Sequence, residues 1–518
     1  MSINGIITKL TTLPLVEEIT PVPDLWKSCQ RLAHLPNILF LDSAGGPRHL
    51  CRYSYLTADP FLWVESRGRK VLITDRTDDG QAVRRFPPTR SESEILQSSS
   101  PVFREGIEHN ANPFHELSKL LERYTTSTIP GLPPFQGGAA GLFGYDLCHH
   151  IEKLPRPKCD EFQVPDMALG FYDWVIAFDH HRERAWLIST GFPETTELTK
   201  AFRAQERADF IRSLITRKRS NKSVWKLDAN PISPVDQYEV PELPGLFSNF
   251  TRARYLDTIA RAVEYVHAGD CFQVNVAQRL LHRVKISPMD LYGRLRSRNP
   301  APFAGYFDLG DFVIASASPE RFLQLQNGHV ETRPIKGTRP RGASLQEDQA
   351  NRTELLGSEK DRAENVMIVD LLRNDLGRVC QYGSVQVSEV CRLESYEYVH
   401  HLVSEVRGQL RDGLGSVDLL TAAFPGGSVT GAPKVRAMEI ITELEQTARG
   451  SYCGSLGYIG FDGNMDTNIL IRTFTVGGGW IQFPVGGGIV ADSVPEKEYE
   501  ETWHKAKGSM EALTPEPK

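Results

Sequence analysis

The chain has 518 residues, of which 40% are hydrophobic, 24% charged and 9% aromatic. This composition is typical of a globular protein and excludes a disordered or fibrous chain. Because single cores stop growing beyond about 250 to 300 residues, the length predicts either several domains or one large intertwined domain. The net charge of -6 and the pI near 6.2 argue against a nucleic-acid-binding protein, which needs a strongly basic face.

The cysteine pattern and the distribution of apolar residues predict a cytoplasmic protein. Eight cysteines are scattered along the chain without a CxxC pair, unlike a disulfide framework or a zinc site, so we expect reduced thiols. No segment reaches the roughly 18 apolar residues of a membrane span, and residues 1–15 have no signal-peptide core. We therefore expect no membrane partner.

The first half of the chain reads mainly as strands and turns. Short apolar runs such as 37–41 and 174–178 alternate with clusters of glycine, proline and serine. The polar stretch at 86–102 reads as a loop, and the basic run at 217–219 begins a proline-rich segment that reads as a connector. We therefore expect an N-terminal region at 1–220, a connector at 221–250 and a C-terminal region at 251–514.

The C-terminal region mixes helices with strands that do not alternate regularly, which indicates an α+β fold. Apolar residues at helical spacing predict a helix from Thr251 to Gly269. Further helices are predicted from Ser358 toward Leu372, from a start that holds Pro433 in its first turn, and from Ser493 and Pro495 onward. Strand-like apolar runs lie at 311–317, 458–461, 469–476 and 480–485.

Two of these helices carry acidic pairs near their first turns. After the N-cap Ser358, Asp361 and Glu364 lie at i and i+3 on one helical face, and Glu498 and Glu501 repeat the spacing in the last helix. Two such pairs could hold a hard cation such as Mg²⁺ together with a substrate carboxylate. Spacing alone favours an ordinary helix start, since acidic residues favour the positive end of the helix dipole.

Three other features allow both a functional and an ordinary interpretation. Lys336, between an isoleucine and a glycine, is either an exposed charge or a desolvated nucleophile with Glu320 as proton donor or acceptor. His401 is either a core histidine or a functional one. Glycines 486–488, and the small-residue loop 426–432 before Pro433, are either turns or places where backbone N–H groups meet a ligand.

Five segments together resemble the chorismate-utilising enzyme family: PIKGTRPRG at 334–342, KDRAENVMIVDLLRNDLGRV at 360–379, HHLVS at 400–404, FPGGSVTGAPKVRAMEII at 424–441 and GGGIVADS at 486–493. PFQGGAAGLFGYDL at 134–147 extends the resemblance into the N-terminal half. It implies an α+β sandwich in which large antiparallel sheets are covered by helices.

The residues at two positions distinguish members of this family that form different products. Isochorismate-forming members carry a water-activating lysine where this chain has Gln273. Anthranilate-forming members typically read PIAGT, whereas members that aminate chorismate at C4 read PIKGT, as here with Lys336. The resemblance therefore implies amination at C4, with Lys336 attacking C2 and Glu320 acting as general acid.

The same resemblance assigns the remaining site positions. It implies Mg²⁺ bound by Glu364 and Glu501, with Asp361 and Glu498 as supporting carboxylates. It places these residues in the chorismate pocket: Thr338, His401, Ser428, Tyr458, Arg472, Gly487, Gly488 and Lys505. Ser43 in the segment 41–43, with Pro302 on a facing loop, resembles the place where family members hold tryptophan as an effector.

The resemblance also implies partners. No glutaminase region is visible, so we expect a separate glutamine amidotransferase subunit to supply ammonia. A separate lyase would convert the product to 4-aminobenzoate for folate synthesis. Two alternatives are an anthranilate synthase large subunit that carries lysine at position 336, and a non-catalytic subunit that binds an aromatic amino acid. Lys336, Glu320 and the acidic pairs argue against the second.

Overall fold

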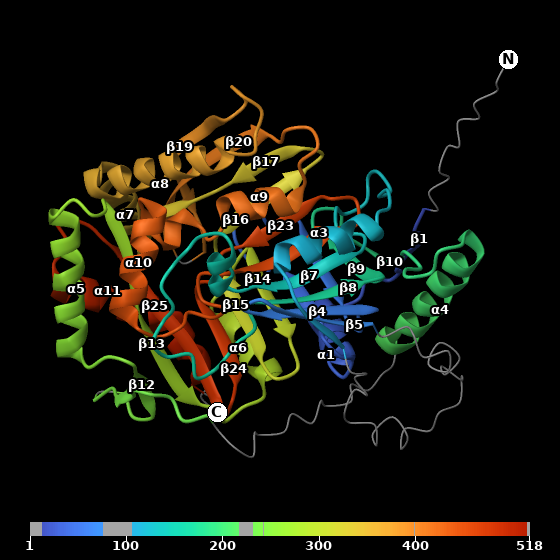
Figure 1. The fold of residues 1–518 in the computed structure, drawn as a ribbon, viewed down its shortest axis with the longest axis horizontal. Helices are drawn as coiled ribbons and strands as arrows, with labels where there is room; N and C mark the ends of the chain where they lie inside the picture. Colours follow the sequence, from blue (N-terminus) through green and yellow to red (C-terminus); the bar gives the residue numbers. More distant parts are fainter. Residues whose placement is uncertain (1–12, 76–105, 217–231, 242, 398, 515–518) are drawn as a thin grey trace.

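The computed structural model describes residues 13–75, 106–216, 232–241, 243–397 and 399–514. Their strands form two large antiparallel sheets, called sheet A and sheet B here, with helices packed around them (Figure 1). This confirms the predicted α+β sandwich. The polar stretch at 86–102, the basic run at 217–219 and the first part of the predicted connector lie outside the described residues.

Sheet A has 13 strands within the described residues. In spatial order they are β1 (Leu15–Glu18), β10 (Arg184–Ser189), β9 (Trp174–Asp179), β3 (Tyr53–Thr57), β2 (Leu39–Asp42), β14 (Phe303–Asp308), β15 (Val313–Ser318), β24 (Thr473–Gly477), β25 (Trp480–Ile489), β13 (Gln273–Arg283), β12 (Leu246–Ser248) and β11 (Tyr238–Glu239), and β21 (Gly431–Ala432) also pairs with β13.

Sheet B has 12 strands in the same part of the chain. They are β18 (Ile335–Pro340), β20 (Val399–Gln409), β17 (His329–Thr332), β16 (Arg321–Gln326), β23 (Met465–Asn468), β22 (Ser455–Gly460), β7 (Gly138–Phe143), β8 (Met167–Tyr172), β4 (Leu62–Arg67), β5 (Lys70–Asp75) and β6 (Ile107–Asn110), and β19 (Gln386–Ser395) also pairs with β20. Each sheet therefore takes strands from both the N-terminal and the C-terminal region, which meet at the β2–β14 and β22–β7 ladders.

The alternation of side chains along the strands builds the layers of the sandwich. In β9, Trp174, Ile176 and Phe178 belong to the cluster that packs under the helices, whereas Val175 and Ala177 belong to the cluster between the sheets. Successive side chains of a strand point to opposite faces, so a strand that is apolar on both faces is buried on both. This accounts for the nearly continuous apolar strands read in the sequence.

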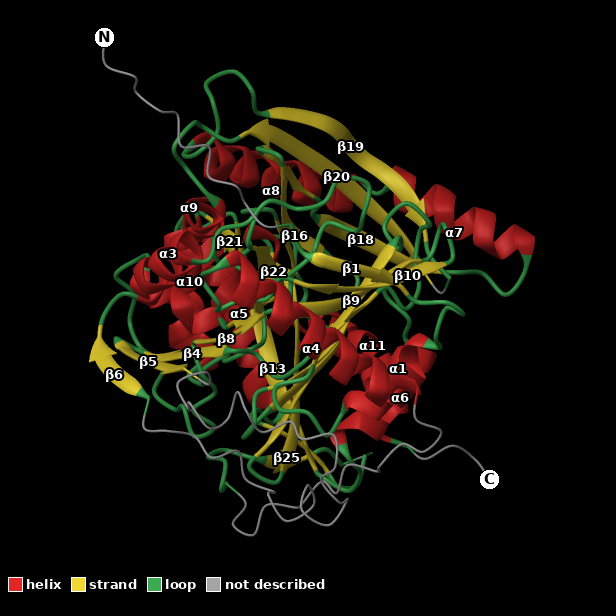
Figure 2. Cartoon of the chain, turned by 90° about the vertical axis from the view of Figure 1, so that its right-hand side faces the viewer, coloured by secondary structure: helices red, strands yellow, loops and turns green. Residues whose placement is uncertain are grey.

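Helices cover the outer faces. They are α1 (Leu25–Leu32), α3 (Pro113–Arg123), α4 (Glu197–Thr216), α5 (Arg252–His267), α6 (Pro288–Arg298), α7 (Leu345–Gly357), α8 (Glu359–Gly377), α9 (Ser416–Ala423), α10 (Lys434–Glu445) and α11 (Pro495–Leu513), with short 3-10 turns η1 (Tyr145–His150) and η2 (Gly427–Val429). Figure 2 shows α8 packed along β20. None of the described helices is both long enough and apolar enough to cross a membrane.

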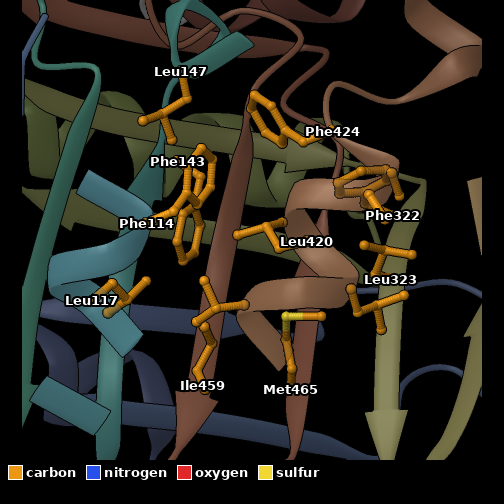
Figure 3. Close-up of a cluster of buried hydrophobic side chains, with 14 of the residues drawn as sticks. Phe114, Leu117, Phe143, Leu147, Phe322, Leu323, Leu420, Phe424, Ile459 and Met465 are labelled. Atoms are coloured by element: carbon orange, nitrogen blue, oxygen red, sulfur yellow. The ribbon is translucent and has the colours of Figure 1, made fainter. Parts of the chain in front are cut away.

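The outer core of sheet B illustrates this packing (Figure 3). Phe114 and Leu117 of α3 and Leu420 of α9 lie in one buried cluster with Phe143 of β7 and Ile459 of β22. Burying each side chain of this size contributes about 1.5–3 kcal/mol to folding. Such packing makes the strands that carry the site a rigid support.

The helix starts agree with the sequence prediction, with two corrections. Pro433 is the N-cap of α10 rather than a residue of its first turn. Thr251 and Ser358 cap α5 and α8 through their side chains. In α11 the N-cap is Val494 rather than Ser493, and Pro495 occupies the first turn. The Ser493 hydroxyl instead donates to Glu498 at 2.6 Å, so it positions a carboxylate predicted to lie in the site. All eight cysteines, each in a described segment, are free.

Candidate active site

Two chain crossings between the sheets place Glu320 and Arg472 side by side. The chain leaves β15 of sheet A and enters β16 of sheet B through Glu320, and it returns from β23 to β24 through Ile469–Arg472. The Ile469 N–H donates to the Glu320 carbonyl at 3.0 Å, and the Ala317 N–H donates to the Arg472 carbonyl at 3.1 Å. These bonds explain why residues 469–472, predicted as strand, lie outside β24.

A β-bulge turns Lys336 out of the regular ladder. Ile335 pairs with Val403 and Thr338 pairs with His401, so Lys336 and Gly337 together oppose a single residue. Gly337 has φ of 83°, and a Cβ atom there would lie 2.9 Å from the Asp361 Cβ. Only glycine fits this close approach, and bulges of this kind commonly re-aim a side chain beside an active site.

Half-buried Lys336 and buried Glu320 lie in one electrostatic environment. The Lys336 Nζ donates to the Ser428 carbonyl at 2.8 Å. Burial lowers the pKa of the Lys336 ammonium, while Glu364 and Glu320 oppose that shift. Burial raises the pKa of Glu320, which is 4% exposed, against a hydrogen bond from Ser428 and the charge of Lys336. The lysine is thus biased toward a neutral amine and the carboxyl toward its protonated form.

Thr338 and His401 form a hydrogen-bonded pair beside the bulge. The Thr338 Oγ1 and the His401 Nδ1 are 2.8 Å apart. Burial, with a smaller contribution from Arg472, lowers the pKa of His401 from 6.5 to about 3. The imidazole is therefore neutral, and its buried Nε2 has no hydrogen-bond partner in the described part of the chain. A polar ligand atom would satisfy this nitrogen.

This buried imidazole predicts part of the acid sensitivity of the protein. Below pH 6.5 the unfolded chain binds a proton at position 401 that the folded chain does not bind until about pH 3, so stability falls as pH falls through this range. We expect His401→Gln to reduce the slope of the unfolding free energy against pH by up to one proton, about 1.4 kcal/mol per pH unit. Urea titrations from pH 4.5 to 7 measure the slope. The same substitution at exposed His504 should leave it unchanged, and an unaltered slope in His401→Gln would contradict a neutral, buried His401.

The two predicted acidic pairs face each other across the site. Glu501 is among the charges that act on the pKa of Glu364, and Lys360 and Lys336 act on both carboxylates. The pKa of Glu364 is raised, chiefly by burial, whereas that of Glu501 is lowered, chiefly by Lys505 at 2.7 Å. Helices α8 and α11 therefore bring together carboxylates that are 137 positions apart in the chain.

Glycines of β25 allow this approach. A Cβ atom on Gly487 would lie 3.4 Å from the Glu498 Oε2 and 3.6 Å from both the Glu501 Oε1 and the Lys505 Nζ. On Gly488 it would lie 1.9 Å from the Gln273 Nε2. The Lys505 Nζ also donates to the Gly486 carbonyl at 2.9 Å. The glycine run therefore leaves the carboxylate and ammonium groups of α11 free access to the strand backbone.

The carboxylates already contact cations of the protein. Lys360 lies 3.7 Å from Glu498, and Arg339 lies 3.2 Å from Asp361. No three His, Cys, Asp or Glu side chains converge as a metal-binding group within the described residues. Mg²⁺ usually needs only one or two protein carboxylates, because waters and substrate oxygens complete its coordination. Glu364 and Glu501 fit that requirement.

Tyr458, predicted in the chorismate pocket, lies elsewhere. It lines a cavity of about 600 Å³ between the two sheets, and its ring stacks on Phe135 at 4.4 Å. Ser43 and Pro302 line the same cavity, and the Ser43 hydroxyl is 3.4 Å from the Pro302 carbonyl. The prediction failed because alternation along β22 turns Tyr458 to the inner face of sheet B. The two residues predicted for the effector are thus brought together.

Sequence reasoning missed Tyr396. Its ring contacts His401, with centroids 5.0 Å apart. The signal that could have found it is its place four residues before the histidine pair in the segment 394–401. It also missed Lys360, which neighbours the predicted acidic pair in sequence.

The chain belongs to the family of chorismate binding enzymes, whose model matches residues 70–511. The resemblance drawn from the motifs is therefore confirmed. Among curated relatives, aminodeoxychorismate synthase component 1 of Escherichia coli K12 is 39% identical over 484 residues, which cover 93% of this chain and 94% of that protein. Anthranilate synthase component 1 of Thermus thermophilus is 43% identical over 394 residues, covering 76% and 80% of the two chains.

Solved structures show the same relationship. Anthranilate synthase component I from Streptococcus pneumoniae has a TM-score of 0.71 and 30% identity, covering 88% of this chain and 92% of that one. The menaquinone-specific isochorismate synthase of Escherichia coli shares the fold, with a TM-score of 0.65 and 16% identity over 97% and 96% of the chains.

Proposed function

We propose that this chain aminates chorismate at C4 to give 4-amino-4-deoxychorismate. The observation that carries the proposal is the half-buried lysine of the β18 bulge, held at 2.8 Å from the Ser428 carbonyl and close to Glu320. The name of the Escherichia coli relative, aminodeoxychorismate synthase component 1, supports the same reaction.

In the proposed mechanism Lys336 is the nucleophile. Its neutral amine attacks C2 of chorismate, both ring double bonds shift by one position, and the C4 hydroxyl leaves as water with a proton from Glu320. Ammonia then adds at C4, both double bonds shift back, and the C2–N bond to the lysine breaks. The lowered pKa of Lys336 and the raised pKa of Glu320 suit these two roles.

The substrate is held by charge and by hydrogen bonds. Arg472 and Lys505 suit the two carboxylates of chorismate. The neutral His401 imidazole offers its unpartnered Nε2 to a substrate oxygen or hydroxyl. The remaining polar contacts come from Thr338, Ser428 and the backbone at Gly487 and Gly488.

We also propose that Glu364 and Glu501 hold Mg²⁺, with Asp361 and Glu498 as supporting carboxylates. When bound, the ion would neutralise and orient a substrate carboxylate. The facing of α8 and α11 supports this assignment. Before the ion binds, Lys505 neutralises Glu501, and Lys360 neutralises Glu498.

Partners follow from this reaction. Ammonia would come from glutamine through a separate amidotransferase subunit, as the words "component 1" in the relatives' names suggest. A separate lyase would then release pyruvate to give 4-aminobenzoate for folate synthesis. We place the reaction in the cytoplasm, where reduced cysteines such as these are expected.

A second candidate is anthranilate synthesis. It is favoured by the relatives of that name, including the one from Thermus thermophilus at 43% identity. Such an enzyme would aminate chorismate at C2 and release pyruvate itself. The lysine in the bulge argues against it, because Lys336 would occupy the approach to C2.

One incubation separates the two candidates. The purified chain is mixed with chorismate, Mg²⁺ and an ammonium salt, with or without an added aminodeoxychorismate lyase, and the products are identified by mass and fluorescence. The proposal predicts a non-aromatic amine that becomes 4-aminobenzoate only with the lyase. Fluorescent anthranilate and pyruvate formed without the lyase would overturn it.

We further propose that the cavity between the sheets binds tryptophan. Its volume of about 600 Å³ suits a small molecule, and it is lined by Ser43, Pro302 and the rings of Tyr53, Tyr55 and Tyr458. Calorimetry should therefore detect tryptophan binding.

Ser43→Leu, which extends a larger side chain into this cavity, should weaken that binding at least tenfold, because the added atoms occupy ligand space. The same substitution at exposed Ser297 is the control. Tyrosine and phenylalanine should compete poorly. Equal tryptophan binding by both variants would place the ligand elsewhere.

A further inference from the structure

Tyr396 occupies the tight connection between β19 and β20. It follows β19 directly, its N–H donates to the Val399 carbonyl at 2.8 Å, and it is 7% exposed. The connection thus fixes a large aromatic ring next to the strand that carries His401. Buried tyrosines usually direct the hydroxyl toward a specific partner.

The ring of Tyr396 contacts His401 of the proposed pocket, and its hydroxyl contacts a buried carboxylate. The ring packs edge-on against the His401 imidazole, at 5.0 Å and 80°. The hydroxyl donates to the Glu394 Oε2 at 3.4 Å.

Glu394, which accepts the hydrogen bond from the Tyr396 hydroxyl, is itself held in place by an ion pair. Glu394 is 6% exposed and forms an ion pair with Arg333, whose other nitrogen contacts Glu405. Arg333 lies three residues before Lys336. The hydroxyl is therefore anchored to a buried charge network that is continuous with the nucleophile strand.

The Arg472 guanidinium, by contrast, has no anchor. Among the described residues its side chain makes neither a hydrogen bond nor an ion pair, although burial lowers its pKa, with Tyr396 and Glu320 opposing that shift. An unpaired guanidinium in such a place is available for an anionic ligand, but its orientation must come from packing. Arg472 lies near enough to His401 to lower the pKa of its imidazole, so the ring that Tyr396 packs against lies beside this guanidinium.

We infer that Tyr396 is a positioning residue for chorismate, because its ring, anchored through the hydroxyl to Glu394, holds the His401 imidazole so that the unpartnered Nε2 meets the substrate. This inference rests on the proposed pocket. It assigns Tyr396 no contact with the reacting atoms, so it concerns substrate affinity and not the chemical step.

The test compares Tyr396→Phe, Glu394→Gln and the double variant, with Tyr382→Phe as control because Tyr382 is fully exposed. Chorismate affinity is measured by calorimetry, and KM and kcat by steady-state kinetics. We expect Tyr396→Phe to weaken affinity and raise KM about tenfold, the effect of losing one hydrogen bond to a charged group, with kcat changed less than twofold.

Glu394→Gln should have a similar effect, and the double variant should bind no more weakly than the weaker single variant, because both act through one contact. Unchanged affinity in Tyr396→Phe would overturn the inference, as would a fall in kcat without a change in KM. Additive losses in the double variant would mean that Glu394 acts independently. If Glu394→Gln fails to fold, Tyr396→Phe alone decides.

The two proposals can fail separately. Binding of chorismate is measured without any product, so the affinity comparison stands even if the unmodified chain makes no 4-amino-4-deoxychorismate. Conversely, formation of that product with no effect of Tyr396→Phe would remove only the positioning role.

Discussion

Replacing Lys336 with alanine should lower amination of chorismate at C4 by at least about a thousandfold, because the substitution removes the group that forms the covalent bond. The fold should survive. The side chain makes one hydrogen bond, to the Ser428 carbonyl, and losing it changes the unfolding free energy by about 0.5–1.5 kcal/mol. Product formation with ammonium salt, and urea unfolding, measure the two effects.

The covalent step has its own readout. Incubation of the unmodified chain with chorismate in the absence of ammonia should give a fraction of protein heavier by chorismate minus water, because the C4 hydroxyl leaves as the C2–N bond forms. Lys336→Ala should show no such species. Lys119→Ala, at an exposed lysine of α3, is the matched control and should behave as the unmodified chain. Undiminished activity in Lys336→Ala would remove the covalent mechanism.

The sequence predicted those features that depend on local chemistry. The caps Thr251 and Ser358, and the i,i+3 spacing of Asp361 and Glu364, are set within one helical turn, so the helices and their acidic faces follow from a few neighbouring residues. The layered sheets followed from the resemblance. The apolar runs alone do not specify which strands pair.

Other features depend on contacts between distant segments. Whether Tyr458 faces the catalytic side or the inner layer depends on the register of β22 between β7 and β23, which no local signal encodes. Arg472, at φ of 53°, lies in an irregular crossing that reads as strand in the sequence. Tyr396 acquires its place because β19 folds back on β20. The residues of a site that depends on contacts between distant segments can therefore be predicted only in part from the sequence.

The second large effect is expected on Mg²⁺ dependence, when a carboxylate of the acidic pairs is replaced. Glu501→Gln keeps the size of the side chain but removes a negative charge that Mg²⁺, a hard cation, requires of its ligands. We expect at least a tenfold rise in the Mg²⁺ concentration that supports half-maximal activity, and a parallel loss of Mg²⁺ binding in calorimetric titrations with chorismate present. Glu364→Gln should behave in the same way, because α8 presents it to the same ion.

Glu500→Gln provides the matched control on the same helix. Glu500 is exposed and neighbours Glu501, but successive residues of a helix do not share a face, so the substitution changes the net charge equally without touching the site. If the metal titration shifts in Glu501→Gln and not in Glu500→Gln, local coordination rather than overall charge accounts for it. If neither shifts, the carboxylates act only as partners of Lys505 and Lys360, and the assignment of Mg²⁺ to the facing pairs of α8 and α11 fails.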